Sequence, residues 1–98
     1  MIRSAMVPIF ILAAIPMAAA ESGLASYYEG IASHGEMTCA HRTRALGSMA
    51  IVTHAGRTIR CRVNDRGPFV RGRIIDVSPS AARALGMTGA GVVLVSVE

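Results

Sequence analysis

The sequence has few aromatic residues and no tryptophan, and this shortage narrows the functions it can support. Aromatic residues make up only 4% of the 98 positions. Outside the N-terminal segment they are Tyr27, Tyr28 and Phe69, too few for a convincing surface on which nucleic-acid bases stack. Lysine is also absent, so ten arginines carry the net charge of +4. Charge alone does not separate this chain from nucleic-acid-binding proteins, but the missing aromatics lead us to expect no nucleic-acid partner.

Long hydrophobic runs are missing except at the N-terminus, where the pattern indicates a signal peptide. A positively charged start, an apolar run over residues 6–15 and an A-x-A motif at Ala18–Ala20 follow the order of such a peptide. The alternative is a membrane anchor, but the run is shorter than the roughly 20 residues that span a bilayer. We expect cleavage before Glu21, with residues 1–20 as signal peptide and residues 21–98 as one exported domain.

The predicted cleavage site is not followed by a cysteine, so no lipid anchor is expected there. The exported domain would then reside in the periplasm or be secreted, with no stable membrane anchor after cleavage. A basic protein in that location meets anionic polymers of the cell envelope. We expect it to act as a monomer.

Cysteine is scarce, and its two copies, Cys39 and Cys61, both lie in the exported part. An oxidising compartment favours a disulfide, and so small a domain often needs a covalent cross-link. Two alternatives stay open: two buried free thiols, or a zinc site in which both cysteines converge with His41 and His54. Zinc sites with paired cysteines usually show C-x-x-C spacing, which is absent. We expect a disulfide, no metal and no cofactor.

The alternation of apolar and polar residues predicts a small, mainly β domain. Strands are expected at residues 23–28, 48–53, 57–63, 73–77 and 91–97, with an irregular segment at 29–41. The run 91–97 is apolar on both faces, which is typical of a central strand. Ser78 and Pro79 favour the start of one short helix, and Gly86 favours its end. These elements indicate a small closed barrel.

Carboxyl groups are also few, and glycan cleavage needs one that protonates the leaving oxygen. Asp76 lies in an expected strand, where we expect it to anchor Arg73 or a helix end. Asp65 lies in a Gly/Pro-rich turn at a strand end, where rigid scaffolds display functional groups. The alternative is an ordinary turn in which Asp65 bonds its own backbone. Because Arg66 would lower the pKa of Asp65 on contact, an acid role requires Arg66 to point elsewhere.

Four motifs occur in a recognisable order: Ala25-Ser26-Tyr27-Tyr28, Ala40-His41-Arg42-Thr43, the run from Val63 to Phe69 and the run from Gly72 to Ser78. Together they resemble the rare lipoprotein A (RlpA)-like family, which includes septal-ring lytic transglycosylases. The resemblance extends over nearly all of residues 21–98, and the stretch from Asn64 to Ser78 is highly specific. It implies a six-stranded double-psi β-barrel with one short helix, as in expansins and some lytic transglycosylases.

The resemblance also implies an activity: cleavage of peptidoglycan between N-acetylmuramic acid and N-acetylglucosamine, with formation of 1,6-anhydro-muramic ends and without metal or cofactor. On the family pattern the catalytic residues are Asp65 as acid, with Glu36 and His41. Substrate-binding residues are expected to be Tyr28, Arg42 and Arg66.

Only five positions separate Glu36 from His41, fewer than is usual in the family. The alternative function is therefore a non-catalytic, expansin-like module that binds the cell wall. The two functions differ in whether Glu36 or His41 completes a site around Asp65. A third interpretation, a secreted partner-binding protein, predicts a large exposed apolar patch.

Overall fold

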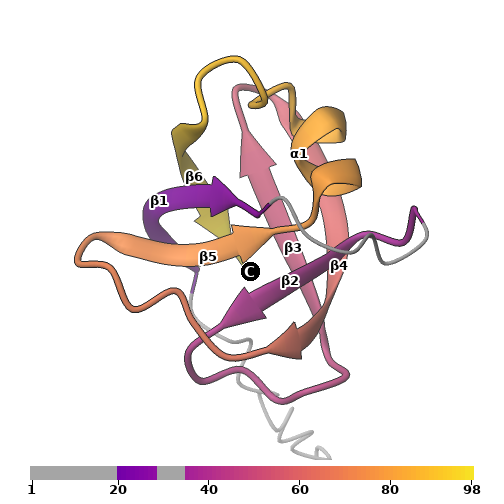
Figure 1. The fold of residues 1–98 in the computed structure, drawn as a ribbon, viewed down its shortest axis with the longest axis vertical. Helices are drawn as coiled ribbons and strands as arrows, with labels where there is room; N and C mark the ends of the chain where they lie inside the picture. The colour runs from indigo at the N-terminus through magenta and orange to yellow at the C-terminus, as the bar shows by residue number, and fades with distance from the viewer. Residues whose placement is uncertain (1–19, 29–34) are drawn as a thin grey trace, which may run out of the picture.

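The computed structural model describes residues 20–28 and 35–98, so nearly all of the predicted signal peptide lies outside the described residues. The described part forms a closed barrel with the strand order β1-β5-β2-β4-β3-β6 (Figure 1). The pairs β1–β5 and β2–β4 are parallel, and the other pairs are antiparallel. The elements are β1 (Glu21–Tyr27), β2 (Thr38–His41), β3 (Met49–His54), β4 (Arg57–Asp65), β5 (Arg73–Val77), α1 (Pro79–Leu85) and β6 (Val92–Val97).

The expected mainly β fold with six strands and one short helix is confirmed, and five strands were located from the sequence to within two residues. In β4, Ile59, Cys61 and Val63 are buried and the residues between them face outward, as the alternation predicts. The helix is the only one in residues 20–28 and 35–98, and with seven residues it is too short to cross a membrane.

The segment 38–41 was predicted wrongly, because β2 replaces the expected irregular structure there. All four residues of β2 are buried. The strand lies between β4 and β5 and bonds to both. A strand of four residues enclosed in this way has no alternation of apolar and polar residues that would reveal it.

Two further predictions need correction at strand ends and faces. β4 continues through Asn64 and Asp65, which we had placed in a turn. β6 lies between β1 and β3, as expected of a central strand, but its outer face is not buried. Leu94 on that face exposes 67% of its surface. A closed barrel gives every strand two neighbours while leaving one face toward solvent, so an apolar outer face does not require burial.

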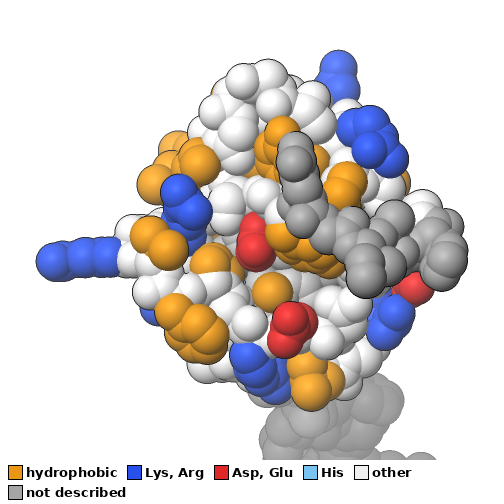
Figure 2. Space-filling view, viewed as in Figure 1, with side chains coloured by type: hydrophobic (Ala, Val, Ile, Leu, Met, Phe, Trp, Pro, Cys, Tyr) orange, Lys and Arg blue, Asp and Glu red, His pale blue; other side chains and the backbone are white. Residues whose placement is uncertain are grey.

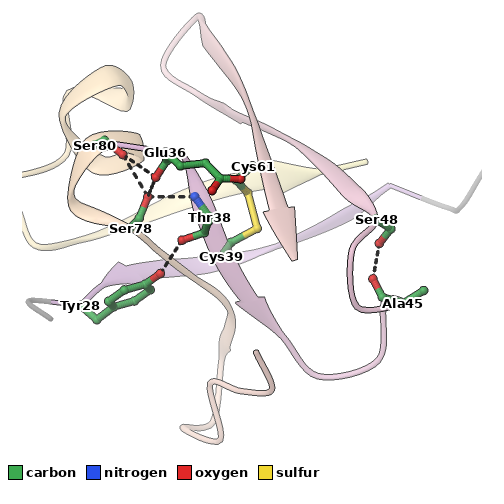
Figure 3. Close-up of a disulfide and its surroundings, with 9 residues drawn as sticks. All are labelled: Tyr28, Glu36, Thr38, Cys39, Ala45, Ser48, Cys61, Ser78 and Ser80. Carbon is green, nitrogen blue, oxygen red and sulfur yellow. Dashed lines mark hydrogen bonds between the residues drawn. A yellow bond between two sulfur atoms is a disulfide. The ribbon is translucent and has the colours of Figure 1, made fainter. Parts of the chain in front are cut away.

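The predicted disulfide is present between Cys39 on β2 and Cys61 on β4 (Figure 3). The two Cα atoms are 5.8 Å apart, and both residues are fully buried. Because each sulfur is bonded to the other, neither is available for the alternative zinc site. Closing a loop of this length stabilises the fold by about 3 kcal/mol on the chain-entropy model.

Helix α1 has the predicted start and end, but Ser78 uses its side chain differently from a helix cap. Ser78 is the N-cap residue with an extended backbone, and its side chain makes no capping bond. Instead, its Oγ accepts the Thr38 N–H at 3.0 Å and donates to the Glu36 carbonyl at 3.3 Å (Figure 3). Gly86 ends the helix with a φ of +72°, a conformation that glycine adopts without strain. Ser78 therefore fastens the start of β2.

Candidate active site

An open cleft of about 410 Å³ lies on the outer wall of the barrel. Figure 2 shows the side on which β5 and β2 lie in front, with acidic side chains around a hollow and apolar and basic side chains at its borders. The lining comes from the end of β1, from β2, β5 and the end of β4, and from the loop that follows β4. These residues are Tyr28, Ala40, Asn64, Asp65, Arg66, Gly67, Pro68, Phe69 and Asp76.

The strand register places two aspartates on either side of one small residue. Ala40 on β2 is the partner of Asp76 on β5 and also of Asp65 on β4. Neighbouring strands lie about 4.8 Å apart, so the two aspartate backbones are separated by roughly 10 Å. Ser26 on β1 extends this line as the partner of Asp76. We call the four residues Ser26, Asp76, Ala40 and Asp65 the cleft row.

Asp76 is the half-buried carboxyl group of the cleft row. Its Oδ1 accepts a hydrogen bond of 3.1 Å from the Ser26 hydroxyl. Burial raises the pKa of Asp76 above its ordinary value, against the lowering effects of the Ser26 hydrogen bond and the Arg73 charge. A carboxyl group that keeps its proton toward higher pH is suited to general acid catalysis.

Asp65 is exposed at the other side of the cleft. Its Oδ1 accepts the Arg66 backbone N–H at 2.8 Å, which is the turn interaction considered from the sequence. The Arg66 guanidinium points elsewhere and donates to the carbonyls of His41 at 3.2 Å and Arg44 at 2.5 Å. The condition set for an acid role of Asp65 is therefore met, although its surroundings are more solvated than those of Asp76.

His41 does not line the cleft but shapes the turn that holds Arg66. It is 2% exposed, and its Nδ1 accepts the backbone N–H groups of Thr43 at 3.1 Å and Arg44 at 3.0 Å. Since a nitrogen that accepts two bonds carries no proton, the ring proton of a neutral His41 lies on Nε2. Nε2 lies 3.0 Å from Glu21 Oε1, which also bonds Arg44 Nη2 at 3.3 Å. The histidine thus connects β1 to the turn at residues 41–44.

Glu36 also lies outside the cleft lining. Its two carboxylate oxygens accept bonds from Arg62, from Nε at 2.7 Å and from Nη2 at 3.1 Å. This pairing lowers the pKa of Glu36 and raises that of Arg62. The Glu36 carbonyl accepts the hydroxyls of Ser78 and Ser80 (Figure 3). In this arrangement Glu36 fastens the segment before β2 and is not directed at Asp65.

Of the three predicted substrate-binding residues, two line the cleft and one does not. Tyr28 lines the cleft, and its hydroxyl shares a 2.8 Å hydrogen bond with Thr38 Oγ1. Arg66 also lines the cleft, and its guanidinium is engaged as described. Arg42 lies outside the lining, and its Nη2 donates to the Arg73 carbonyl at 2.8 Å. Among residues 20–28 and 35–98, no three His, Cys, Asp or Glu side chains gather closely enough to share a metal ion.

Sequence reasoning missed Asp76, Ser26 and Phe69 as candidate site residues. The signal for Asp76 was present, because Ile75 and Val77 point inward and the residue between them must point outward. What the sequence lacked was the strand order, which places β2 between β5 and β4 and so brings Asp76 opposite Asp65.

Comparison with known proteins agrees with this architecture. The sequence model of a family described as "Lytic transglycolase" matches residues 20–97. The "Probable endolytic peptidoglycan transglycosylase RlpA" of a Nostoc species is 46% identical over 91 residues, which cover 78% of this chain and 24% of that protein. The "Endolytic peptidoglycan transglycosylase RlpA" of Pasteurella multocida is 42% identical over 92 residues, covering 81% and 31%. The chain thus spans less than a third of the length of these relatives.

Solved structures with the same fold include an expansin from Clavibacter michiganensis, with a TM-score of 0.68 and 26% identity over 82% of this chain and 50% of the expansin. A variant of that expansin, matched equally well, is in complex with cellohexaose. A papain inhibitor from Streptomyces matches with a TM-score of 0.68 and 25% identity over 86% of this chain and 96% of the inhibitor. The family match covers the whole barrel and confirms the resemblance carried by the motifs, so the chain belongs to the lytic transglycolase family of double-psi β-barrel proteins.

Proposed function

We propose that residues 21–98 form a domain that cleaves peptidoglycan glycan strands by lytic transglycosylation, leaving 1,6-anhydro-muramic ends. The observation that carries the proposal is the cleft row, in which two carboxyl groups in different surroundings face one open cleft. The names of the relatives support this reaction and substrate, although the chain corresponds to only part of each relative. The expansin complex with cellohexaose supports a glycan chain as the ligand of such a barrel.

Asp76 is the group best suited to donate the proton, because burial favours its protonated form. In the first step its proton passes to the glycosidic oxygen between N-acetylmuramic acid and N-acetylglucosamine, and the bond from that oxygen to muramic C1 breaks. In the second step the muramic C6 hydroxyl oxygen bonds to C1 and returns its proton to the Asp76 carboxylate. No water is consumed, and the enzyme regains its starting state.

Asp65 is assigned a different part from the one predicted from the family pattern. From the opposite side of the cleft, its carboxylate would stabilise the positive charge that develops on the sugar ring when the C1–O bond breaks. Tyr28 and Arg66, which also line the cleft, would contact the glycan strand beside Asp65.

For His41 and Glu36 we propose positioning roles in place of direct catalysis. His41 holds the turn whose carbonyls bind Arg66, and Arg66 in turn begins the loop that carries the cleft wall. Glu36 holds the chain that leads into β2. Arg42, which lies outside the cleft lining, is proposed to hold the start of β5 through the Arg73 carbonyl.

The test is digestion of purified sacculi followed by mass analysis of the released fragments. The wild-type domain should release anhydro-muropeptides, which are lighter by one water than the products of hydrolysis. Asp76→Asn, which keeps the shape of the side chain but cannot act as an acid, should lower the yield by about 100-fold or more. Asp65→Asn should lower it by about tenfold. If Asp65→Asn abolishes the yield and Asp76→Asn does not, the acid is Asp65.

A second candidate, the non-catalytic wall-binding module, is favoured by one observation, the likeness to an expansin. It predicts that the domain sediments with sacculi and releases no anhydro products. Release of such products that depends on either aspartate contradicts it.

We also propose that residues 1–20 are removed on export, leaving the domain in the periplasm or secreted. The disulfide supports an oxidising location, because cytosolic reductants disfavour such bonds. Intact-mass analysis of the protein recovered from cells should give a chain that begins at Glu21. A mature chain that retains residue 1 would overturn the proposal.

A further inference from the structure

Phe69 is the most exposed of the large apolar side chains in the part of the chain that the structure describes. It exposes 80% of its surface, although burial of a phenylalanine ring normally stabilises a fold. The ring lies at a cleft, because Phe69 lines the same cleft as Asp65 and Asp76. An aromatic ring that lines an open cleft together with two carboxyl groups is typical of a ligand site.

The loop between β4 and β5 holds this ring in place at both ends. At its start, the Arg66 N–H bonds Asp65 Oδ1, and the Arg66 guanidinium bonds two backbone carbonyls of the turn at residues 41–44. At its end, the Arg73 N–H bonds the Val70 carbonyl at 3.1 Å. Because both ends of this loop are fixed by hydrogen bonds, the loop holds the Phe69 ring at the cleft.

The Phe69 ring lies beside Gly67 within the loop. Gly67 has a φ of +121°, and a Cβ atom built on it would lie 3.6 Å from Phe69 Cε2. That distance is an ordinary van der Waals contact, so a Cβ atom would fit there and only the positive φ favours glycine. Gly67 and Phe69 both line the cleft, so the ring and this part of the loop belong to the same wall.

We propose that Phe69 is a stacking subsite for a sugar ring of the glycan strand, next to the ring whose C1 bond breaks. A β-linked pyranose presents axial C–H groups on its faces, and these pack on an aromatic face with little loss of hydration. The carboxyl groups of the cleft row act at the bond that breaks, and Phe69 binds the apolar face of the neighbouring sugar ring. This inference rests on the proposed function for its substrate, a strand of N-acetylated amino sugars.

A single tryptophan placed at the subsite tests binding directly, because the chain contains no tryptophan. Phe69→Trp should show a saturable change in emission when a β-1,4-linked oligomer of N-acetylglucosamine is added. Val70→Trp is the matched control, since Val70 is the next residue, is 51% exposed and does not line the cleft. An unchanged emission at position 69, or the same change at both positions, would overturn the proposal.

Kinetics on sacculi test the role of the ring in turnover. Phe69→Ala should raise the half-saturating substrate concentration about fivefold and leave the rate at saturation within about twofold. Phe69→Tyr should restore the wild-type value and Phe69→Leu should not, because stacking needs an aromatic face. A leucine variant equal to wild type, or an alanine variant with unchanged half-saturation, contradicts the proposal.

The two proposals fail in different ways. If the wild type releases anhydro products and Phe69→Ala has the wild-type half-saturation, the stacking subsite is wrong and the lytic function stands. If no products form but the tryptophan at position 69 reports oligomer binding, the lytic function is wrong and the sugar subsite stands.

Discussion

Two acidic regions lie along β2, the cleft row at Ala40 and the Glu36–Arg62 pair at the start of the strand. Their carboxyl groups differ in burial, in bonding partner and in the direction of the pKa shift. In the cleft row, Asp76 is half-buried, bonds a neutral hydroxyl and has its pKa raised by burial. In the pair formed by Glu36 and Arg62, the carboxylate is exposed, bonds a guanidinium through both oxygens and has its pKa lowered. In the proposed function the first arrangement supplies the proton donor, and the second fastens the chain.

The bonding partner and the exposure of a carboxyl group therefore decide its role more than its presence in a motif does. Glu36 was assigned to the site from the family pattern, and its side chain pairs with Arg62 on β4. Asp76 was set aside as an anchor from the sequence, and the strand register places it in the cleft.

Removing the disulfide should weaken both regions at once, because Cys39 lies in the strand between them. We expect the double variant Cys39→Ala with Cys61→Ala to lose about 3 kcal/mol of unfolding free energy. Chemical denaturation at equal pH measures this loss. A free energy equal to that of the wild type would show that β2 is held by its hydrogen bonds and packing alone.

Filling the space between the two aspartates should disable the cleft and leave the Glu36–Arg62 pair intact. Ala40→Val adds two methyl groups where the glycan must approach, and a misplacement of about 1 Å costs on the order of 100-fold in rate. Release of anhydro products from sacculi measures the effect. Ala45→Val is the matched control, because Ala45 is exposed outside the cleft lining. Equal losses in both variants would contradict the assignment of the cleft.

Removing the Ser26 hydroxyl should increase the difference in pKa shift between Asp76 and Glu36. The Ser26 hydrogen bond lowers the pKa of Asp76, so Ser26→Ala should raise that pKa further and move the alkaline limb of the pH–rate profile to higher pH. The lost hydrogen bond should cost about 1 kcal/mol of stability. Ser22→Ala, at an exposed position on the same strand, should leave the profile unchanged. A limb that moves to lower pH would show that Asp76 is not the proton donor.

Breaking the exposed Glu36–Arg62 pair should have the smallest effect on stability and on product release. Glu36→Gln should leave the midpoint of chemical denaturation close to that of the wild type and change product release by less than about threefold, because an exposed ion pair contributes little. Because the pKa of Glu36 is lowered in the folded state, the contribution of the pair is present above the unfolded pKa of 4.5 and is lost as pH falls through the folded value. A loss of product as large as that of Asp76→Asn would return Glu36 to the catalytic residues.

Much of the fold was predictable because its signals are local. The alternation in β4, the Pro79 start and Gly86 end of α1, and the cysteine pair each depend on a few neighbouring residues. β2 was not predictable from periodicity, because four enclosed residues that include Thr38 and His41 show no apolar pattern.

The site was less predictable, because it depends on which strands become neighbours. The motif containing Asp65 was recognised, but its opposition to Asp76 comes from the insertion of β2 between β5 and β4. The direction of the Arg66 side chain also depends on a distant turn, whose carbonyls receive it. Local sequence patterns carry no information about either contact.

A carboxyl NMR titration of Asp76 and Glu36 in one sample of the folded domain tests whether Asp76 is the proton donor. We predict that Asp76 titrates above the ordinary aspartate value of 3.8 and Glu36 below the ordinary glutamate value of 4.5. The raised pKa also means that the folded state binds the Asp76 proton more tightly than the unfolded state does. The contribution of Asp76 to stability is therefore present below its unfolded pKa of 3.8 and is lost as pH rises through its folded pKa. An Asp76 midpoint at or below 3.8 would contradict its assignment as the proton donor.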